Sequence, residues 1–161
     1  MCIRDRYIND RLVESEIIPG NYVSLHNKWK KNDIIRLELS IRTRLIESNP
    51  LVEETRNEIA IQRGPVVYCL ESPDLPSGIR VSDIGIPKDI HLSPEKMEIE
   101  HAVLTALSGD ALVINHKEWG NKLYREVPAT PAEPLKIRLI PYFAWGNRGK
   151  SEMSVWMPVC R

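Results

Sequence analysis

Hydrophobic and polar residues alternate along the early part of this chain. From Ile34 to Ile41, apolar side chains occupy every second position and polar side chains occupy most of the others. This period of two is typical of a half-buried β-strand. Asn21 to Leu25 is expected to form a short strand before it, and Asn32 and Asp33 favour a turn between the two. The stretch therefore predicts a β-hairpin.

Two β-rich runs follow, from Glu58 to Gln62 and from Val66 to Leu70. Gly64 and Pro65 lie between them and interrupt regular pairing. Gly64 can take backbone angles closed to other residues, and Pro65 stiffens the entry to the next strand. We expect a tight corner between two strands.

Further strands are predicted downstream. Met97 to Leu104 alternates, and Ala111 to Asn115 follows the turn signal Ser108-Gly109-Asp110, so these two segments are expected to form a hairpin. Leu135 to Ile140 and Met153 to Met157 are the last two predicted strands.

The whole pattern predicts an all-β fold, an antiparallel β-sandwich or a jelly roll, in which any helix is short. Proline- and glycine-rich stretches place one boundary near Ser72 and a second in the approach to Leu135. Residues 1–6 do not alternate, and we expect them to be a leader foreign to the domain.

The composition limits the classes of partner that we expect for this chain. Lys and Arg number 22 and Asp and Glu number 22, so the formal net charge is zero, which argues against nucleic acid and against an anionic membrane surface. No apolar run approaches the roughly 20 residues that span a bilayer, and the first residues lack the core of a signal peptide. Three scattered cysteines suggest no disulfide framework. The compartment stays open, with the cytoplasm slightly favoured.

Residues that could carry chemistry do not form a recognisable site. The histidines stand apart, and structural or surface roles are expected for them: His26, His91, His101 and His116, of which His116 with Glu118 is the best metal-site fragment. The loop carboxylates are expected to be solvated charges: Asp110, Glu118, Glu126 and Glu133. Cys69 lies in an apolar run and is expected to pack in a core. No nucleophile-elbow, phosphate-loop or dinucleotide motif occurs.

Four tryptophans offer flat faces that could stack on sugar rings: Trp29, Trp119, Trp145 and Trp156. Trp156 lies between Val155 and Met157 and is expected in the core, while Trp145 is expected to pack at a corner. Packing is therefore the favoured role for these two residues.

Two segments go beyond generic β-sandwich character. Gln62 to Glu71 reads QRGPVVYCLE, and Ile140 to Gly149 reads IPYFAWGNRG and runs on to EMSVWMP at Pro158. Together they resemble glycoside hydrolase family 127, the β-L-arabinofuranosidase-like proteins, which carry similar segments in this order after their catalytic domain. Within these segments, Arg63 or Arg148 is expected to pair with loop carbonyls or carboxylates.

The resemblance implies an architecture in which an (α/α)6 barrel is followed by two β-sandwich parts, the second inserted into the first. Residues 7–72 and 136–161 would then form the end of the first sandwich, and residues 73–135 the inserted one. The barrel would be the partner of this chain in the same polypeptide, and the full-length enzyme is a candidate homodimer.

The resemblance also implies where the chemistry lies. The family's mechanism is associated with a zinc-bound cysteine nucleophile, further cysteine and glutamate ligands and a glutamate acid/base, all in the barrel. This chain has no segment matching that site, so no catalytic, cofactor-binding or metal residue is assigned to it, and zinc is implied only for the barrel.

We therefore expect an inactive, accessory C-terminal region of an enzyme that hydrolyses terminal arabinofuranosides in glycans, with an exposed apolar patch where the rest of the protein packs. The alternative is a stand-alone carbohydrate-binding module, which needs two or more tryptophans exposed on one face or rim. A complete small enzyme is the third hypothesis, and it would need convergent carboxylates in a pocket.

Overall fold

The computed structural model describes residues 4–14, 16, 18, 20–114, 121–126 and 133–160. It is all-β, with no helix of seven or more residues, which confirms the predicted fold class. No helix among the described residues is long and apolar enough to cross a membrane. The chain divides into two compact units, Met1–Arg42 and Thr43–Arg161, and each is described by itself.

The first unit is a three-stranded antiparallel sheet. Its central strand β1 (Arg4–Ile8) pairs with β2 (Arg11–Leu12) on one side and with β3 (Ile35–Leu39) on the other. Asn9 and Asp10 have φ angles of 49° and 62°, as the two-residue turn of a tight hairpin requires. The side chain of Asn9 also accepts a hydrogen bond from the Ile34 N–H at 3.0 Å, which fixes the start of β3.

The predicted hairpin of Asn21 to Leu25 with the next strand is wrong, because Asn21 to Leu25 forms no strand and β3 pairs with β1 instead. This pairing sets Tyr7 opposite Arg36, and the guanidinium carbon of Arg36 lies 4.0 Å from the centre of the Tyr7 ring. Such a cation–π contact favours β1 as the partner strand. Arg4 to Arg6 form the first part of β1. The foreign origin of residues 1–6 stays a prediction.

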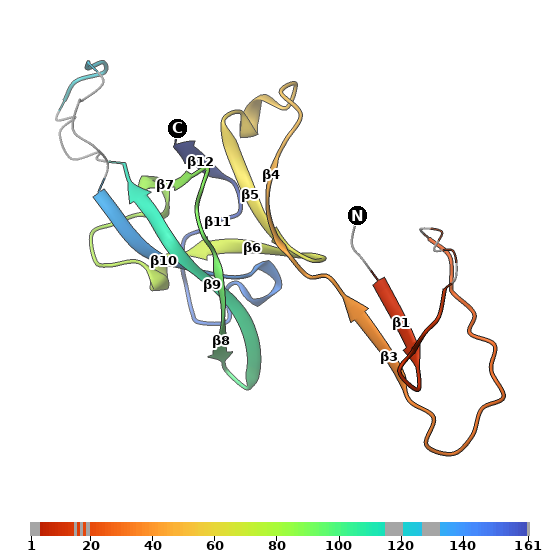
Figure 1. The fold of residues 1–161 in the computed structure, drawn as a ribbon. Helices are drawn as coiled ribbons and strands as arrows, with labels where there is room; N and C mark the ends of the chain where they lie inside the picture. The colour runs from red at the N-terminus through yellow and green to blue at the C-terminus, as the bar shows by residue number, and fades with distance from the viewer. Residues whose placement is uncertain are drawn as a thin grey trace. The chain divides into compact units, whose positions relative to one another are not determined.

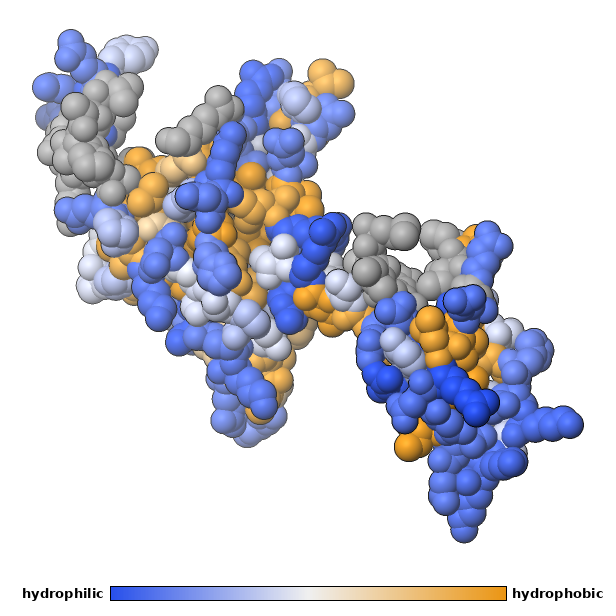
Figure 2. All heavy atoms as spheres, viewed as in Figure 1, coloured by the Kyte–Doolittle hydropathy of each residue, from blue (hydrophilic) through white to orange (hydrophobic). Residues whose placement is uncertain are grey.

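One face of β3 is apolar and exposed. Four alternating side chains, called the β3 patch here, have exposed fractions of 55%, 56%, 50% and 44%: Ile35, Leu37, Leu39 and Ile41. They were expected to be half-buried on a core. Hydrophobic atoms are visible on the surface of this unit in Figure 2. The first unit therefore exposes an apolar patch, and the packing of the rest of the protein against it stays a prediction.

The described residues of the second unit form nine strands and four short 3₁₀ helices. The strands are β4 (Thr43–Glu47), β5 (Glu58–Arg63), β6 (Val66–Glu71), β7 (Ile84–Pro87), β8 (Ser93–Ile99), β9 (Ala102–Val113), β10 (Glu133–Pro141), β11 (Met153–Ser154) and β12 (Met157–Cys160). The helices are η1 (Glu53–Thr55), η2 (Ser72–Asp74), η3 (Val81–Asp83) and η4 (Tyr142–Ala144).

Six of these strands close into a barrel-like ring in the order β5, β6, β10, β9, β7, β12 and back to β5 (Figure 1). All pairs in the ring are antiparallel except β7 with β12. Outside the ring, β4 pairs with β5, β8 with β9, and β11 with β6. Closure leaves the six ring strands few free edges.

The ring encloses the larger of two cores. Ile61, Leu70, Leu107 and Leu139 are fully buried in it with other aliphatic side chains. Neighbouring positions on β6 and β10 point to the opposite face, so Cys69 and Ile140 enter a second, smaller core with Ile99 and Ala144. Fully burying one such aliphatic side chain contributes about 1.5–3 kcal/mol.

Strands β5, β6 and β10 confirm the predicted runs, and Gly64 has a φ of 58° at the predicted corner. The predicted turn at Ser108-Gly109-Asp110 is wrong, because β9 continues through it and the β8–β9 hairpin turns at Glu100, whose φ is 53°. Gly109 is needed for another reason: a Cβ there would lie 2.6 Å from the carbonyl oxygen of His91. A glycine inside a strand often marks such a close backbone approach.

Two other strand predictions differ from the structure. The predicted last strand is split into β11 and β12 by a bend at Val155 and Trp156, and β4 was not predicted.

The predicted domain boundaries can be compared with the strand pairing. Strands from residues 73–135 pair with strands on both sides of that segment, and the compact units divide after Arg42. Proline and glycine near Ser72 instead mark η2 and the loops that follow it. The inserted sandwich of residues 73–135 has no counterpart in this pairing and stays a prediction.

Candidate functional site

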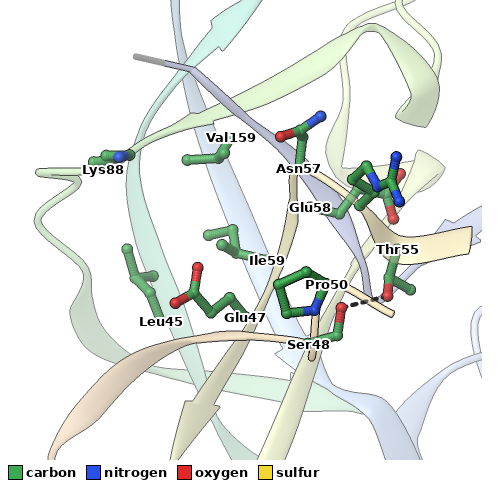
Figure 3. Close-up of a pocket in the computed structure, with 11 residues that line it drawn as sticks. Leu45, Glu47, Ser48, Pro50, Thr55, Asn57, Glu58, Ile59, Lys88 and Val159 are labelled. Carbon is green, nitrogen blue, oxygen red and sulfur yellow. Dashed lines mark hydrogen bonds between the residues drawn. The ribbon is translucent and has the colours of Figure 1, made fainter. Parts of the chain in front are cut away.

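One hollow in the second unit lies between the end of β4, the β4–β5 connection and the strands β5 and β12 (Figure 3). Its volume is about 560 Å³. Leu45, Ile59 and Val159 supply apolar lining, and Ser48 and Thr55 share a hydrogen bond of 2.6 Å between their hydroxyl groups. The charged lining is mixed: Glu47, Arg56, Glu58 and Lys88.

This hollow has no aromatic lining residue, so it offers no flat face for a sugar ring. It also contains none of the four loop carboxylates singled out from the sequence. Asp110 lies in β9 opposite Lys136, Glu133 begins β10, and both are exposed, as is Glu126. Glu118 lies outside the described residues. Asp110, Glu126 and Glu133 therefore do not form a site in this hollow.

The histidines also remain apart from any metal site. His26, His91 and His101 are exposed, and no group of three potential metal ligands occurs among residues 4–14, 16, 18, 20–114, 121–126 and 133–160. His116 lies outside these ranges. Cys69 is fully buried, and burial raises the pKa of its thiol to about 12. The predicted packing role of Cys69 is confirmed, since a thiol with this pKa stays protonated and unreactive at neutral pH.

The most distinctive polar cluster joins the two segments that carry the family resemblance. Glu71, at the end of β6, is fully buried, and Asp74, in η2, has a side chain only 5% exposed. Arg148 lies between them: its Nε donates to Glu71 Oε2 at 3.0 Å, and its Nη2 donates to Asp74 Oδ2 at 2.5 Å. The expectation that Arg148 would pair with carboxylates is confirmed.

Further donors complete the surroundings of Glu71. The Ser151 hydroxyl donates to Oε1 at 2.5 Å, and the Gly146 N–H donates to the same oxygen at 3.3 Å. Burial acts to raise the pKa of Glu71, but the hydrogen bonds from Ser151, Arg148 and Gly146 outweigh it and leave the pKa below its usual value. The carboxylate is thus ionised and fully paired, unlike the raised-pKa carboxyl group that a glycosidase uses as its acid.

This cluster holds the loop from Tyr142 to Ser151. Within the loop, the Trp145 N–H donates to the Tyr142 carbonyl at 3.1 Å, and the Asn147 amide donates to the Ala144 carbonyl at 3.3 Å. Gly146 and Gly149 have φ angles of 81° and 102°, which glycine adopts most readily. The sequence signals glycine, asparagine and arginine in this segment therefore fix one loop conformation.

The loop places three aromatic side chains on the surface. Tyr142, Phe143 and Trp145, called the aromatic turn here, have exposed fractions of 47%, 66% and 43%. The rings of Tyr142 and Trp145 are nearly parallel, with an interplanar angle of 12° and centroids 6.5 Å apart. Trp145 does lie at a corner, as predicted, but it is not packed away. Sequence reasoning considered only the tryptophans and missed Tyr142 and Phe143.

The other tryptophans lie elsewhere. Trp29 is 49% exposed in the first unit, and Trp156 is half-buried at the bend between β11 and β12, not in a strand core. Trp119 lies outside the described residues. Among the described residues of the second unit, Trp145 is the only exposed tryptophan.

Comparisons with known proteins agree with this picture. The family model described as "Glycoside hydrolase family 127 C-terminal domain" matches residues 43–158. A curated "Non-reducing end beta-L-arabinofuranosidase" of Bifidobacterium longum subsp. longum is 28% identical over 134 residues, which cover 76% of this chain and 19% of that protein.

Solved structures are similar over nearly the whole chain. One, titled "Glycoside hydrolase", has a TM-score of 0.85 and 42% identity, covering 99% of this chain and 26% of its own. Another, titled a GH127 beta-L-arabinofuranosidase from Geobacillus stearothermophilus T6, has a TM-score of 0.81 and 29% identity, covering 98% and 24%. The chain spans about a quarter or less of the length of these relatives.

Proposed function

Since this chain belongs to glycoside hydrolase family 127 through its C-terminal domain, we propose that it serves as the non-catalytic accessory region of a longer enzyme resembling β-L-arabinofuranosidase. That enzyme hydrolyses terminal arabinofuranosides in glycans. The observation that carries the proposal is the family match over residues 43–158 together with the small share of each relative that the chain covers.

The buried charges support a structural role for this region. The side chains of Glu71 and Asp74 are 0% and 5% exposed, and both carboxylates pair with Arg148. A general acid needs a carboxyl group that is protonated near neutral pH. The lowered pKa of Glu71 is the opposite arrangement, so this cluster positions a loop and donates no proton.

Zinc, which the family resemblance implies, does not fit the described residues. Cys69 is fully buried with a pKa of about 12, and Cys160 is half-buried with a pKa also raised by burial. Within the part of the chain that the structure describes, no group of three potential metal ligands occurs. A zinc site needs thiolates, imidazoles or carboxylates gathered in one place. We assign the zinc and the nucleophile to the (α/α)6 barrel of the longer polypeptide.

The β3 patch supports a partner within that polypeptide. Four aliphatic side chains exposed on alternate positions of one strand are rarely left in water. We propose that the barrel, or strands that precede this chain in the longer protein, cover these side chains. A homodimer of the full-length enzyme and a cytoplasmic location stay predictions.

The genomic region upstream of the Met1 codon tests the proposal. An open reading frame joined to Tyr7 that encodes a helical barrel with paired cysteines and glutamates is the expected result. A stop codon and a promoter immediately before Met1 would contradict it and favour the stand-alone carbohydrate-binding module.

A further inference from the structure

A second hollow in the Thr43–Arg161 unit lies beside the aromatic turn. Its volume is about 330 Å³, near the lower end for small-molecule sites. Phe143 and Asn147 line it from the loop after β10, and Glu100 and His101 line it from the turn between β8 and β9. The loop after β10 and the turn of the β8–β9 hairpin, which are distant in sequence, therefore meet at this hollow.

We propose that this hollow binds one or two residues of a neutral oligosaccharide. Sugars present an apolar C–H face and a rim of hydroxyl groups. Phe143, 66% exposed, supplies an aromatic face for the first. Asn147, His101 and Glu100 supply donors and acceptors for the second.

The charge of the lining selects a neutral ligand. Among the described residues that line the hollow, Glu100 is the only acidic one, and none is a lysine or an arginine. A phosphate or uronate group would therefore meet a carboxylate without a cation to compensate it. A polyhydroxyl ligand without charge has no such conflict.

Both sides of the hollow are held in place before any ligand arrives. The loop side is fixed by the Asn147 hydrogen bond to Ala144 and by Arg148, which pairs with Glu71 and Asp74. The hairpin side contains Glu100 with a φ of 53°, a left-handed conformation that is unfavourable for a glutamate. Strained residues of this kind cluster at binding sites, where surrounding structure holds them.

The test is isothermal titration of the 161-residue chain with arabinotriose and xylotriose at neutral pH, with folding of each variant checked by near-ultraviolet circular dichroism. The choice of arabinose rests on the proposed function, whereas the site itself does not. Phe143→Leu keeps the apolar bulk and removes the ring, and Phe143→Tyr keeps the ring. Tyr124→Leu is the matched control, since Tyr124 is 88% exposed away from the hollow.

We expect the wild-type chain to bind at least one of the two sugars. Phe143→Tyr and Tyr124→Leu should bind that sugar with the wild-type affinity, and Phe143→Leu should bind it roughly tenfold more weakly. Trigalacturonate, which is anionic, should bind more weakly than the neutral sugar that the chain binds. Absence of binding by the folded wild-type chain, or equal binding by Phe143→Leu, overturns the proposal.

A protein surface is the competing occupant of the aromatic turn. In that case the chain binds neither sugar, and Phe143→Leu lowers the melting temperature of the longer protein without affecting the chain alone. That outcome overturns the sugar site and leaves the accessory function standing. Conversely, sugar binding with no barrel encoded upstream overturns the accessory function alone.

Discussion

Arg148 and Glu71 lie 77 positions apart in the sequence, and the Nε of Arg148 donates a hydrogen bond of 3.0 Å to Oε2 of Glu71. A second hydrogen bond, from Nη2 of Arg148, reaches the same oxygen. Glu71 ends β6, and Arg148 lies in the loop that displays the aromatic turn. The pair therefore connects the two sequence segments by which the family is recognised.

Replacing Arg148 with methionine should leave Glu71 and Asp74 buried without their main cation. Breaking one partner of a buried pair costs about 3–5 kcal/mol, and the Arg148 side chain is only 18% exposed. Urea unfolding should show this loss in the free energy of unfolding. The control is Glu152→Gln, whose pair with Arg80 is 54% and 68% exposed and should cost less than about 1 kcal/mol. Equal losses in the two variants would contradict a special role for Arg148.

Acid should destabilise the protein through Glu71 and Glu95. Hydrogen bonds lower the pKa of Glu71 despite its burial, and the hydrogen bond from Arg138 is the main cause of the lowered pKa of Glu95. The unfolded chain therefore binds more protons than the folded one below the usual value of 4.5. Stability is fully present above that pH and is lost as the pH falls toward the lower folded values.

Urea midpoints measured between pH 7 and pH 3 check this pH dependence. They should stay level down to about pH 5 and then fall. Arg148→Met should fall less steeply, because one cause of the lowered pKa of Glu71 is removed. A midpoint that does not change between pH 5 and pH 3 would refute the expectation.

Gly109→Ala should destabilise the second unit by steric conflict alone. The new Cβ would meet the His91 carbonyl oxygen at 2.6 Å, and overpacking of this kind typically costs about 1–3 kcal/mol. Val103→Ala is the control in the same strand, where the side chain is 68% exposed and the change should stay within about 0.5 kcal/mol. Thermal unfolding of the two variants measures the difference, and a neutral Gly109→Ala would show that Gly109 and the His91 backbone do not approach so closely.

Leu37→Ser tests what covers the β3 patch. In the 161-residue chain the side chain is 56% exposed, so the free energy of unfolding should change by less than about 0.5 kcal/mol. In the longer protein the leucine should be buried, and its loss should cost about 1.5–3 kcal/mol. Equal, small effects in both proteins would mean that the patch stays open.

The local sequence pattern predicted the positions of single strands better than it predicted which strands pair. The β-rich runs Glu58 to Gln62 and Leu135 to Ile140 identified β5 and β10, because β-branched and apolar content acts within one strand. The pattern could not show that β3 pairs with β1, or that β7 and β12 close the ring, since pairing depends on distant segments. Ser108-Gly109-Asp110 was mistaken for a turn because close packing and turning both require glycine.

The site was predictable only in part. Arg148 was expected to pair with carboxylates, because its planar guanidinium suits two oxygens at once. Glu71 and Asp74 were not expected as its partners, since nothing local marks a carboxylate as buried. Phe143 and Glu100 line the same hollow because the loop after β10 packs beside the β8–β9 turn, which no spacing in the sequence encodes.

Hydrolysis of p-nitrophenyl β-L-arabinofuranoside tests the central claim most directly, with the 161-residue chain and the longer protein encoded at the same locus measured side by side in the presence of zinc. The account predicts nitrophenol release by the longer protein and none above background by the folded chain. Hydrolysis by the chain alone, abolished when its own carboxylates are replaced, would contradict the account and place the chemistry in this region.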